Sequence, residues 1–175
     1  MNAKRNSCII GAISSILLLF LDQLTKYFAS TNLKGGNSII LIKDVFQLHY
    51  LENRGAAFGM MQGMKILFVI GTVLMLALMI FIYWKSPMDK RYRWARFILI
   101  LLTSGALGNL TDRLVLDYVV DFFYFELINF PIFNVADIYV TCGMVLMILF
   151  CFFYYKEEEL DELLPFRKAQ KKNGK

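Results

Sequence analysis

The chain is too apolar for an ordinary soluble domain. It has 175 residues, of which 58% are hydrophobic, and its mean hydropathy is +0.53. This composition indicates a membrane protein. The net charge of +5 is no argument for a nucleic acid partner, because most of the excess Lys and Arg residues flank the apolar runs.

Four apolar runs are long enough to cross a bilayer as helices, which takes about 20 residues each. They predict membrane helices at Cys8–Phe28, Ile66–Trp84, Trp94–Leu114 and Ala136–Tyr155. The first run follows Lys4 and Arg5, as the core of a cleavable signal peptide follows basic residues. It lacks a small-residue cleavage site and continues into a polar segment, so we interpret it as a retained helix. The four helices predict one transmembrane domain over residues 1–155.

The basic residues predict the orientation of these helices. They cluster before the first run, between the second and third, and after the fourth, as Lys4, Arg5, Lys85, Lys90, Arg91, Arg93, Arg96, Arg167, Lys168, Lys171, Lys172 and Lys175. The loop Leu114–Val135 instead has three acidic residues and no Lys or Arg. By the positive-inside rule, both termini are cytoplasmic, and the loops Ala29–Lys65 and Leu114–Val135 lie outside. Ala29–Lys65 fits the rule less well, because it contains several basic residues.

The first helix carries two charges near its outward end, Asp22 and Lys26, which are four residues apart and share one face. They could form an ion pair in which Lys26 reaches the membrane interface. Charges within a membrane segment are costly and mark functional candidates. Because other helices bring polar residues to the same level, we expect Asp22 and Lys26 to brace a polar site.

The outward segment Ala29–Lys65 has two stretches rich in β-branched and apolar residues, Ser38–Ile42 and Val45–Leu51. They predict a small sheet against the outer leaflet. Asn53 and Arg54 follow in a turn of small residues. This turn could simply expose an Arg; as part of a site, Asn53 would hold a substrate backbone and Arg54 would tie the loop to the helix ends.

The third helix ends in a polar face. Gly105, Gly108, Asn109 and Asp112 have spacings of three, four and seven from the first of them, so they share one side of a helix. The glycines would let a neighbouring backbone approach closely. The next helix begins with a similar set, Asn134, Asp137 and Thr141. If the two helices are antiparallel neighbours, the carboxyl groups of Asp112 and Asp137 should meet at one end of the hairpin.

Three further parts of the chain complete the prediction. The stretch Val119–Phe125 is rich in aromatic residues and predicts a short outward strand. The tail Lys156–Lys175 mixes Glu and Lys residues and predicts a solvated helix end followed by disorder. His49 is the one histidine, and the three cysteines show no C-x-x-C spacing, so zinc and disulfides have little support.

Hydrolysis is the reaction that this polar set suits. His49 stands alone, which argues against a Ser or Cys nucleophile activated by His, and a Ser/Lys pair with Lys26 lacks a serine at the right depth. Two adjacent carboxyl groups can share a proton, so that one acts as base on a water and the other as acid. Water is then the nucleophile, and neither a metal nor another cofactor is needed. Pepsin-like enzymes use this chemistry, but their all-β fold and D-T-G motifs are not present here.

The chain resembles the lipoprotein signal peptidase (signal peptidase II) family. The resemblance rests on five motifs in the family's order, which together span the chain up to about Tyr155: Asp22-Gln23-Leu24-Thr25-Lys26, Asn53-Arg54-Gly55-Ala56-Ala57-Phe58, Gly105-Ala106-Leu107-Gly108-Asn109-Leu110-Thr111-Asp112-Arg113, Val120-Asp121-Phe122 and Phe133-Asn134-Val135-Ala136-Asp137. Each motif is weak alone, and the five together are highly specific.

The resemblance implies an aspartic endopeptidase of the bacterial cytoplasmic membrane. The family removes the signal peptide of prolipoproteins by cutting before a diacylglyceryl-modified cysteine at the outer face. By motif position, Asp112 and Asp137 would be the catalytic pair. The supporting or substrate-contacting residues would be Asp22, Lys26, Asn53, Arg54, Asn109, Arg113, Asn134 and Ala136. The fold would be an all-α membrane protein, with four transmembrane helices, a small outward β-sheet at Ser38–Leu51 and a short interfacial helix within Asn53–Gln62.

The expected partners are lipid-modified prolipoproteins and membrane lipids, and the expected state is a monomer. The main alternative is a small non-enzymatic subunit of a proton- or ion-coupled transporter, since paired intramembrane aspartates also serve there. Against it, the charges lie at one face and not along a path across the bilayer. A purely structural helix bundle would leave Asp22, Asp112 and Asp137 at one level unexplained.

Overall fold

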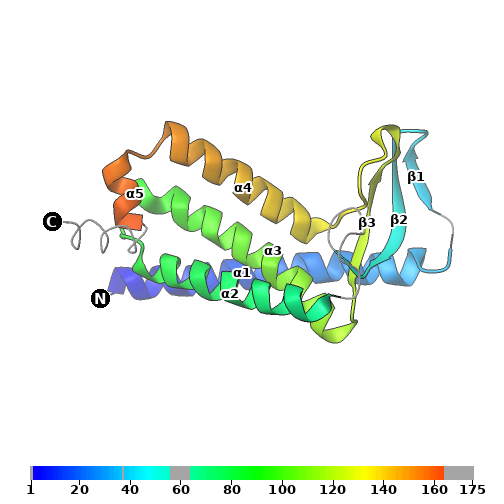
Figure 1. Ribbon diagram of the computed structural model, residues 1–175, viewed down its shortest axis with the longest axis horizontal. Coiled ribbons are helices and arrows are strands. Elements are labelled where there is room, and N and C mark those ends of the chain that lie inside the picture. The colour runs from blue at the N-terminus through cyan, green and yellow to red at the C-terminus, as the bar shows by residue number, and fades with distance from the viewer. Residues whose placement is uncertain (1, 37, 56–63, 164–175) are drawn as a thin grey trace.

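Four long helices make up most of the protein. The computed structural model describes residues 2–36, 38–55 and 64–163. The helices are α1 (Asn2–Leu33), α2 (Lys65–Lys85), α3 (Arg93–Val115) and α4 (Val135–Phe153), and Figure 1 shows them side by side along the long axis. Each belongs to a segment that is long and apolar enough to cross a membrane. The predicted four-helix membrane fold is therefore confirmed.

The helix α3 is the centre of the bundle, because α1, α2 and α4 all pack against it. Two glycines permit this packing. A Cβ atom on Gly105 would collide with the Ala136 carbonyl oxygen of α4, and one on Gly108 would collide with the Asp22 carboxyl group of α1. Gly105 and Gly108 thus act as the predicted small-residue contacts and bring α1 and α4 to the polar end of α3.

The first helix is longer than its apolar run. It begins at Asn2 and continues to Leu33, beyond the predicted Cys8–Phe28. The added turn at its C-terminal end is held by packing, since Ala29 and Leu33 are buried against Val120 and Phe122. The apolar run therefore predicted the part of α1 that could cross a bilayer. It did not predict the last turn, which packs against Val120 and Phe122.

A three-stranded antiparallel sheet lies across one end of the bundle (Figure 1). Its order is β1 (Ile39–Ile42), β2 (Phe46–Asn53) and β3 (Val119–Phe125). The sequence predicted all three: β1 and β2 lie in the outward segment Ala29–Lys65, and β3 is the predicted strand rich in aromatic residues. The pairing of Leu51 with Asp121 and of Asn53 with Val119 joins the two loops that connect the helices. The prediction of an interfacial helix within Asn53–Gln62 concerns mainly residues 56–62, which are outside the described residues.

The opposite end of the bundle holds a short helix, α5 (Glu157–Leu163), and the single turn η2 (Lys90–Tyr92). Another such turn, η3 (Glu126–Ile128), follows β3. The predicted fourth helix reached Tyr155, but α4 ends at Phe153, and Tyr155 instead packs with Tyr92 and Leu163. The Arg91 guanidinium also pairs with the Glu159 carboxylate at 2.8 Å. The start of the tail is therefore docked on η2 and the first turn of α3, where the sequence predicted a solvated helix end.

Candidate active site

Asp137 is fixed in the first turn of α4 by a capping box. The Asn134 side-chain oxygen accepts the backbone N–H of Asp137 at 3.0 Å, and the Asp137 carboxylate accepts the backbone N–H of Asn134 at 3.1 Å. This reciprocal pair satisfies two N–H groups that the start of a helix leaves free. The segment Asn134–Asp137 therefore fixes the Asp137 carboxyl group through two hydrogen bonds of its own.

Asn109 connects this cap to α3. Its side-chain Nδ2 donates to the Asp137 carboxylate at 2.8 Å, and its Oδ1 accepts from Lys26 Nζ at 3.0 Å. The same Oδ1 accepts from Asn134 Nδ2 at 3.1 Å. Asn109 therefore holds the Asp137 carboxyl group from α3.

Asp121 of β3 is the second acid at this position. Only 1% of its surface is exposed, and its carboxyl oxygens accept from Asn53 Nδ2 at 2.9 Å and from Asn134 Nδ2 at 2.6 Å. Burial raises the pKa of Asp121 to about 7, and the nearby charge of Asp137 adds to the rise. The two amide hydrogen bonds and the charge of Lys26 oppose it. Asp121 can therefore carry a proton near neutral pH.

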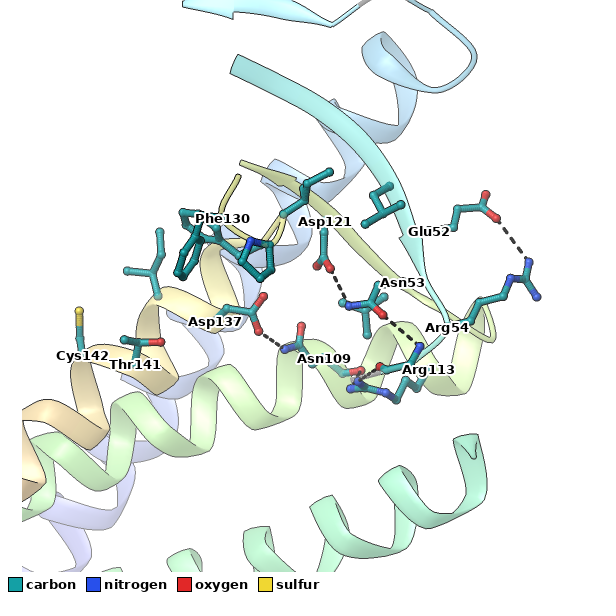
Figure 2. A pocket seen from close by; sticks show the side chains of 17 residues that line it. Glu52, Asn53, Arg54, Asn109, Arg113, Asp121, Phe130, Asp137, Thr141 and Cys142 are labelled. Carbon is teal, nitrogen blue, oxygen red and sulfur yellow. Dashed lines mark hydrogen bonds and ion pairs between the residues drawn. The ribbon is translucent and has the colours of Figure 1, made fainter. Parts of the chain in front are cut away.

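Asp121 and Asp137 share one cavity of about 690 Å³. In Figure 2, Asp121 extends from β3 and Asp137 from the start of α4 toward the same space. Its polar wall also includes Asn53, Arg54, Asn109 and Arg113, and its apolar wall is formed mainly by Leu51, Val119, Phe130, Pro131, Ile132, Phe133 and Ile138. Such a cavity, largely apolar with a few converging polar groups, has the composition of a substrate site.

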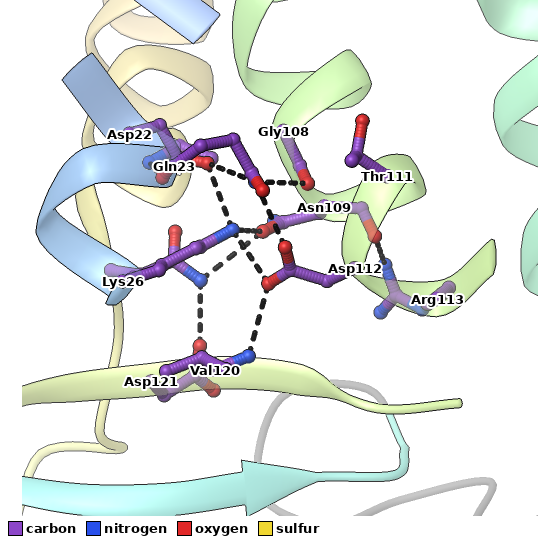
Figure 3. A network of polar contacts seen from close by, with 12 residues as sticks. Asp22, Gln23, Lys26, Gly108, Asn109, Thr111, Asp112, Arg113, Val120 and Asp121 are labelled. Atoms are coloured by element: carbon purple, nitrogen blue, oxygen red, sulfur yellow. Dashed lines mark hydrogen bonds and ion pairs between the residues drawn. The ribbon is translucent and has the colours of Figure 1, made fainter. Parts of the chain in front are cut away.

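Asp112 lies elsewhere. It is 2% exposed, and the described residues that line the cavity do not include it. Its carboxylate pairs with Lys26 Nζ at 2.9 Å, and it accepts from the Val120 backbone N–H at 3.1 Å and from Gln23 Nε2 at 2.9 Å (Figure 3). The structure therefore does not bring Asp112 into the cavity with Asp137, where the sequence expectation placed it.

Asp22 and Lys26 are buried inside the bundle. Their exposed fractions are 0% and 3%, and their charged groups are 2.9 Å apart. The Asp22 carboxylate also accepts the backbone N–H of Ala136 at 2.8 Å. The Lys26 amine is enclosed by acceptors, so the structure does not show the alternative in which Lys26 extends away from the bundle. The pair instead contacts the segment that carries Asp137.

Of the remaining predicted residues, Arg54 and Arg113 line the cavity and Ala136 does not. Arg54 is 60% exposed, pairs with Glu52 at 3.4 Å and stacks over the Tyr118 ring at 5.4 Å. Arg113 lines the cavity and donates to the Gly55 carbonyl oxygen at 3.4 Å. Ala136 is fully buried and contributes its backbone N–H to Asp22.

Two residues of the site were missed from the sequence as functional groups, Asp121 and Gln23. Both lie in motifs that the sequence analysis singled out. Asp121 interrupts an apolar strand, Val119–Phe125, and a lone acid in such a strand is a signal that could have identified it. Among the described residues, no group of three His, Cys, Asp or Glu side chains could hold a metal ion.

The chain matches known proteins over most of its length. A family model described as signal peptidase (SPase) II matches residues 14–153. The lipoprotein signal peptidase of Clostridioides difficile (strain 630) is 42% identical over 139 residues, which are 79% of this chain and 92% of the relative. The lipoprotein signal peptidase of Streptococcus thermophilus (strain CNRZ 1066) is also 42% identical, over 83% of this chain and 92% of its own.

Solved structures agree with the family match. A bacterial membrane enzyme solved by the in meso method is 30% identical, with a TM-score of 0.76 over 85% of this chain and 92% of that one. A second such enzyme has a TM-score of 0.71, again at 30% identity. Sequence and fold, together with the two acids in one cavity, support one conclusion. This chain belongs to the signal peptidase II family and is a multi-pass membrane protease.

Proposed function

We propose that this protein removes signal peptides from prolipoproteins by cutting before a diacylglyceryl-modified cysteine, with Asp121 and Asp137 as the catalytic pair. The observation that carries this assignment is that both acids line one cavity, while Asp112 lies outside it in a buried ion pair. The proposal keeps Asp137 from the sequence prediction and replaces Asp112 by Asp121. The transporter alternative receives no support from the family match.

The two acids suit different halves of peptide hydrolysis. Asp137 accepts a hydrogen bond at each carboxyl oxygen, from the Asn109 side chain and from the Asn134 backbone N–H. Asp121 is buried and can hold a proton near neutral pH. We assign Asp137 as the base that takes a proton from water and Asp121 as the acid.

The hydroxyl oxygen of that water then bonds to the scissile carbonyl carbon, and Asp121 gives its proton to the carbonyl oxygen. When the tetrahedral intermediate collapses, the C–N bond breaks and the leaving nitrogen takes a proton from Asp137. The hydroxyl formed on that carbon returns its proton to Asp121, which restores both acids. The reaction consumes one water and needs no covalent enzyme intermediate.

The cavity walls suit a substrate that is partly peptide and partly lipid. Asn53 and Arg54 line one side and offer N–H donors to a peptide backbone. Phe130, Phe133 and Ile138 line another side and suit acyl chains. A signal helix and a diacylglyceryl group both partition into the membrane, so they would deliver the scissile bond to a cavity at the membrane surface.

The proposed orientation places the cavity at the outer face of the inner membrane and both termini in the cytoplasm. In Figure 1 the start of α1 and α5 lie at one end of the bundle, and the sheet lies at the other. The end with α5 also carries Lys85, Lys90, Arg91, Arg93 and Arg96. Basic residues favour the cytoplasmic side. We further propose that the protein acts as a monomer surrounded by lipid, since one chain supplies both acids.

Incubation of purified protein with a lipid-modified prolipoprotein tests this function. Mass spectrometry of the products should show cleavage immediately before the modified cysteine. The same precursor without its diacylglyceryl group is the matched control and should be cut far more slowly. Equal cleavage of the two forms would remove lipid recognition from the proposal, and failure to cut the modified form would remove the function.

A further inference from the structure

We infer that Asp22, Lys26 and Asp112 form a buried brace that positions the two cavity acids through the backbone, without taking part in proton transfer. The inference rests on the proposed function, because it concerns the same pair, Asp121 and Asp137. It differs in what it assigns. It assigns a positioning role to Asp22, Lys26 and Asp112, although charged residues of these types often act as catalysts.

The contacts of the brace are arranged symmetrically about the two acids. The Asp112 carboxylate accepts the backbone N–H of Val120 at 3.1 Å, and Val120 directly precedes Asp121. The Asp22 carboxylate accepts the backbone N–H of Ala136 at 2.8 Å, and Ala136 directly precedes Asp137. Each carboxylate of the brace therefore holds the peptide group next to one catalytic acid.

Lys26 joins the two halves. Its amine lies 2.9 Å from the Asp22 carboxylate and 2.9 Å from the Asp112 carboxylate, and it donates to Asn109 Oδ1 at 3.0 Å. A lysine ammonium has three N–H donors, and all three have acceptors here. Asn109 in turn donates to Asp137. Figure 3 shows Lys26 at the centre of these contacts, between α1, α3 and β3.

The fully engaged amine also argues against a Ser/Lys mechanism. The three N–H groups of the Lys26 amine are taken up by Asp22, Asp112 and Asn109, and none of these partners is a serine. The Ser104 hydroxyl donates to its own helix at the Ile100 carbonyl oxygen, 2.7 Å away, and the described residues that line the cavity include neither Ser104 nor Lys26. Neither member of such a pair is therefore directed at the cavity.

Burial separates the brace from the chemistry. The three side chains are at most 3% exposed, so neither substrate nor bulk water reaches them. Gln23 Nε2 occupies a remaining acceptor position on each carboxylate, at 2.9 Å from Asp112 and 3.2 Å from Asp22. A group enclosed in this way can transmit position to the peptide groups of Val120 and Ala136, but it cannot deliver a proton to a substrate.

Two substitutions at one position distinguish positioning from catalysis. Asp112→Asn keeps a carbonyl oxygen that can accept from both Val120 N–H and Lys26, if the Gln23 amide turns its oxygen to the new NH₂ group. It also leaves Lys26 paired with Asp22. Asp112→Leu removes the acceptor and leaves the buried Val120 N–H unsatisfied, which is costly.

The experiment measures kcat and KM on a lipid-modified precursor for these two variants, for Asp121→Asn and for Thr111→Val. Thr111 is the matched control, because it neighbours Asp112 and its hydroxyl donates only to its own helix, at the Leu107 carbonyl oxygen. We expect Asp112→Asn to keep kcat within about tenfold of the parent, and Asp112→Leu to lose about 100-fold in kcat with KM nearly unchanged. Asp121→Asn should lose several orders of magnitude, and Thr111→Val should behave as the parent.

Folded Asp112→Asn that is as inactive as Asp121→Asn would overturn the inference, because an amide fails only where acid–base chemistry is required. Full activity of Asp112→Leu would also overturn the inference, because the acceptor for the Val120 N–H would then not be needed to position Asp121. If Asp112→Leu is not recovered folded, Asp22→Asn decides: activity close to that of Asp112→Asn supports the brace, and inactivity of folded protein contradicts it. An active Asp121→Asn would instead contradict the proposed catalytic pair.

Discussion

Asp121 and Asp137 come from different elements, β3 and α4, and the Asn134 side chain joins them. Asn134 Nδ2 donates to the Asp121 carboxyl group at 2.6 Å, and Asn134 Oδ1 accepts the backbone N–H of Asp137 at 3.0 Å. A single buried amide thus sets the relative position of the two acids. Two carboxyl groups held in one cavity are difficult to ionise together, so they should act as a unit that shares one proton.

The first prediction concerns this pair. Asparagine has nearly the size of aspartate but can act neither as base nor as acid. Asp121→Asn and Asp137→Asn should each reduce kcat by several orders of magnitude, and the double variant should be little worse than either single one. Cleavage assays on a lipid-modified precursor would measure this, with thermal unfolding in detergent as the control for folding. Folded Asp121→Asn with near-parental turnover would falsify the assignment.

The second prediction concerns pH. The pKa of Asp121 is raised to about 7, so this acid loses its proton as the pH rises through that value. If Asp121 is the proton donor, the rate should fall on the alkaline side of a bell-shaped profile. The hydrogen bond from Asn53 stabilises the ionised form. Asn53→Ala should therefore raise the pKa of Asp121 further and move the alkaline limb to higher pH.

The other groups that act on Asp121 are Asn134, Asp137 and Lys26, and they stay in place in this variant. Gln47→Ala is the matched control, since Gln47 is in the same strand and donates to Glu126, which does not line the cavity. The shape of the profile is what matters, because loss of Asn53 can also lower the overall rate. An alkaline limb that stays in place or moves to lower pH would contradict the role of Asp121 as the acid.

Much of the fold could be predicted from local patterns. Runs of about 20 apolar residues locate the four helices, and stretches rich in β-branched or aromatic residues locate the three strands. The ends were less accurate where packing decides them. Leu33 extends α1 because it packs under β3, and Tyr155 leaves α4 because it packs with Tyr92. Such contacts join distant parts of the chain, and no local pattern contains them.

The site could be predicted as a set of residues but not as an arrangement. Helical spacing shows that Gly108 and Asp112 share a face of α3, and the structure turns that face toward Asp22 and Lys26. Spacing alone cannot tell a face that lines a cavity from one that packs inside the bundle. Asp121 reaches the cavity through the pairing of β3 with β2, which depends on a register between strands about 70 positions apart.

The third prediction concerns topology. We expect the loop at Asp117, between α3 and β3, to lie outside the cell. In a background without the native thiols Cys8, Cys142 and Cys151, a cysteine introduced by Asp117→Cys should react with a membrane-impermeant reagent in intact cells. A cysteine introduced by Asp89→Cys, between α2 and α3, should react only after permeabilisation. The opposite pattern would invert the proposed orientation.

The fourth prediction concerns the close approach of α3 and α4. Gly105→Ala should lower the thermal stability and the activity together, because the added Cβ collides with the Ala136 carbonyl oxygen next to Asp137. Gly71→Ala in α2 is the control, since a Cβ there meets nothing within 4 Å. It should be neutral or stabilise the helix by up to about 1 kcal/mol. Equal melting temperatures for the two variants would show that α4 can shift away from α3 without cost.

The last prediction concerns the charge balance of the brace. Lys26→Met removes the cation between Asp22 and Asp112 and leaves two buried carboxylates without a counter-ion. Removing one partner of a buried ion pair costs about 3–5 kcal/mol, so this variant should melt at a much lower temperature or be recovered in low yield.

Lys34→Met is the matched control. Lys34 is 54% exposed and pairs with Glu52 at the surface, where an ion pair contributes little to stability. The double variant Lys26→Met/Asp112→Asn should recover part of the lost stability, because only one of the two carboxylates then remains. If it is no more stable than Lys26→Met alone, uncompensated charge is not the cause of the loss, and Lys26 stabilises the bundle through packing of its side chain.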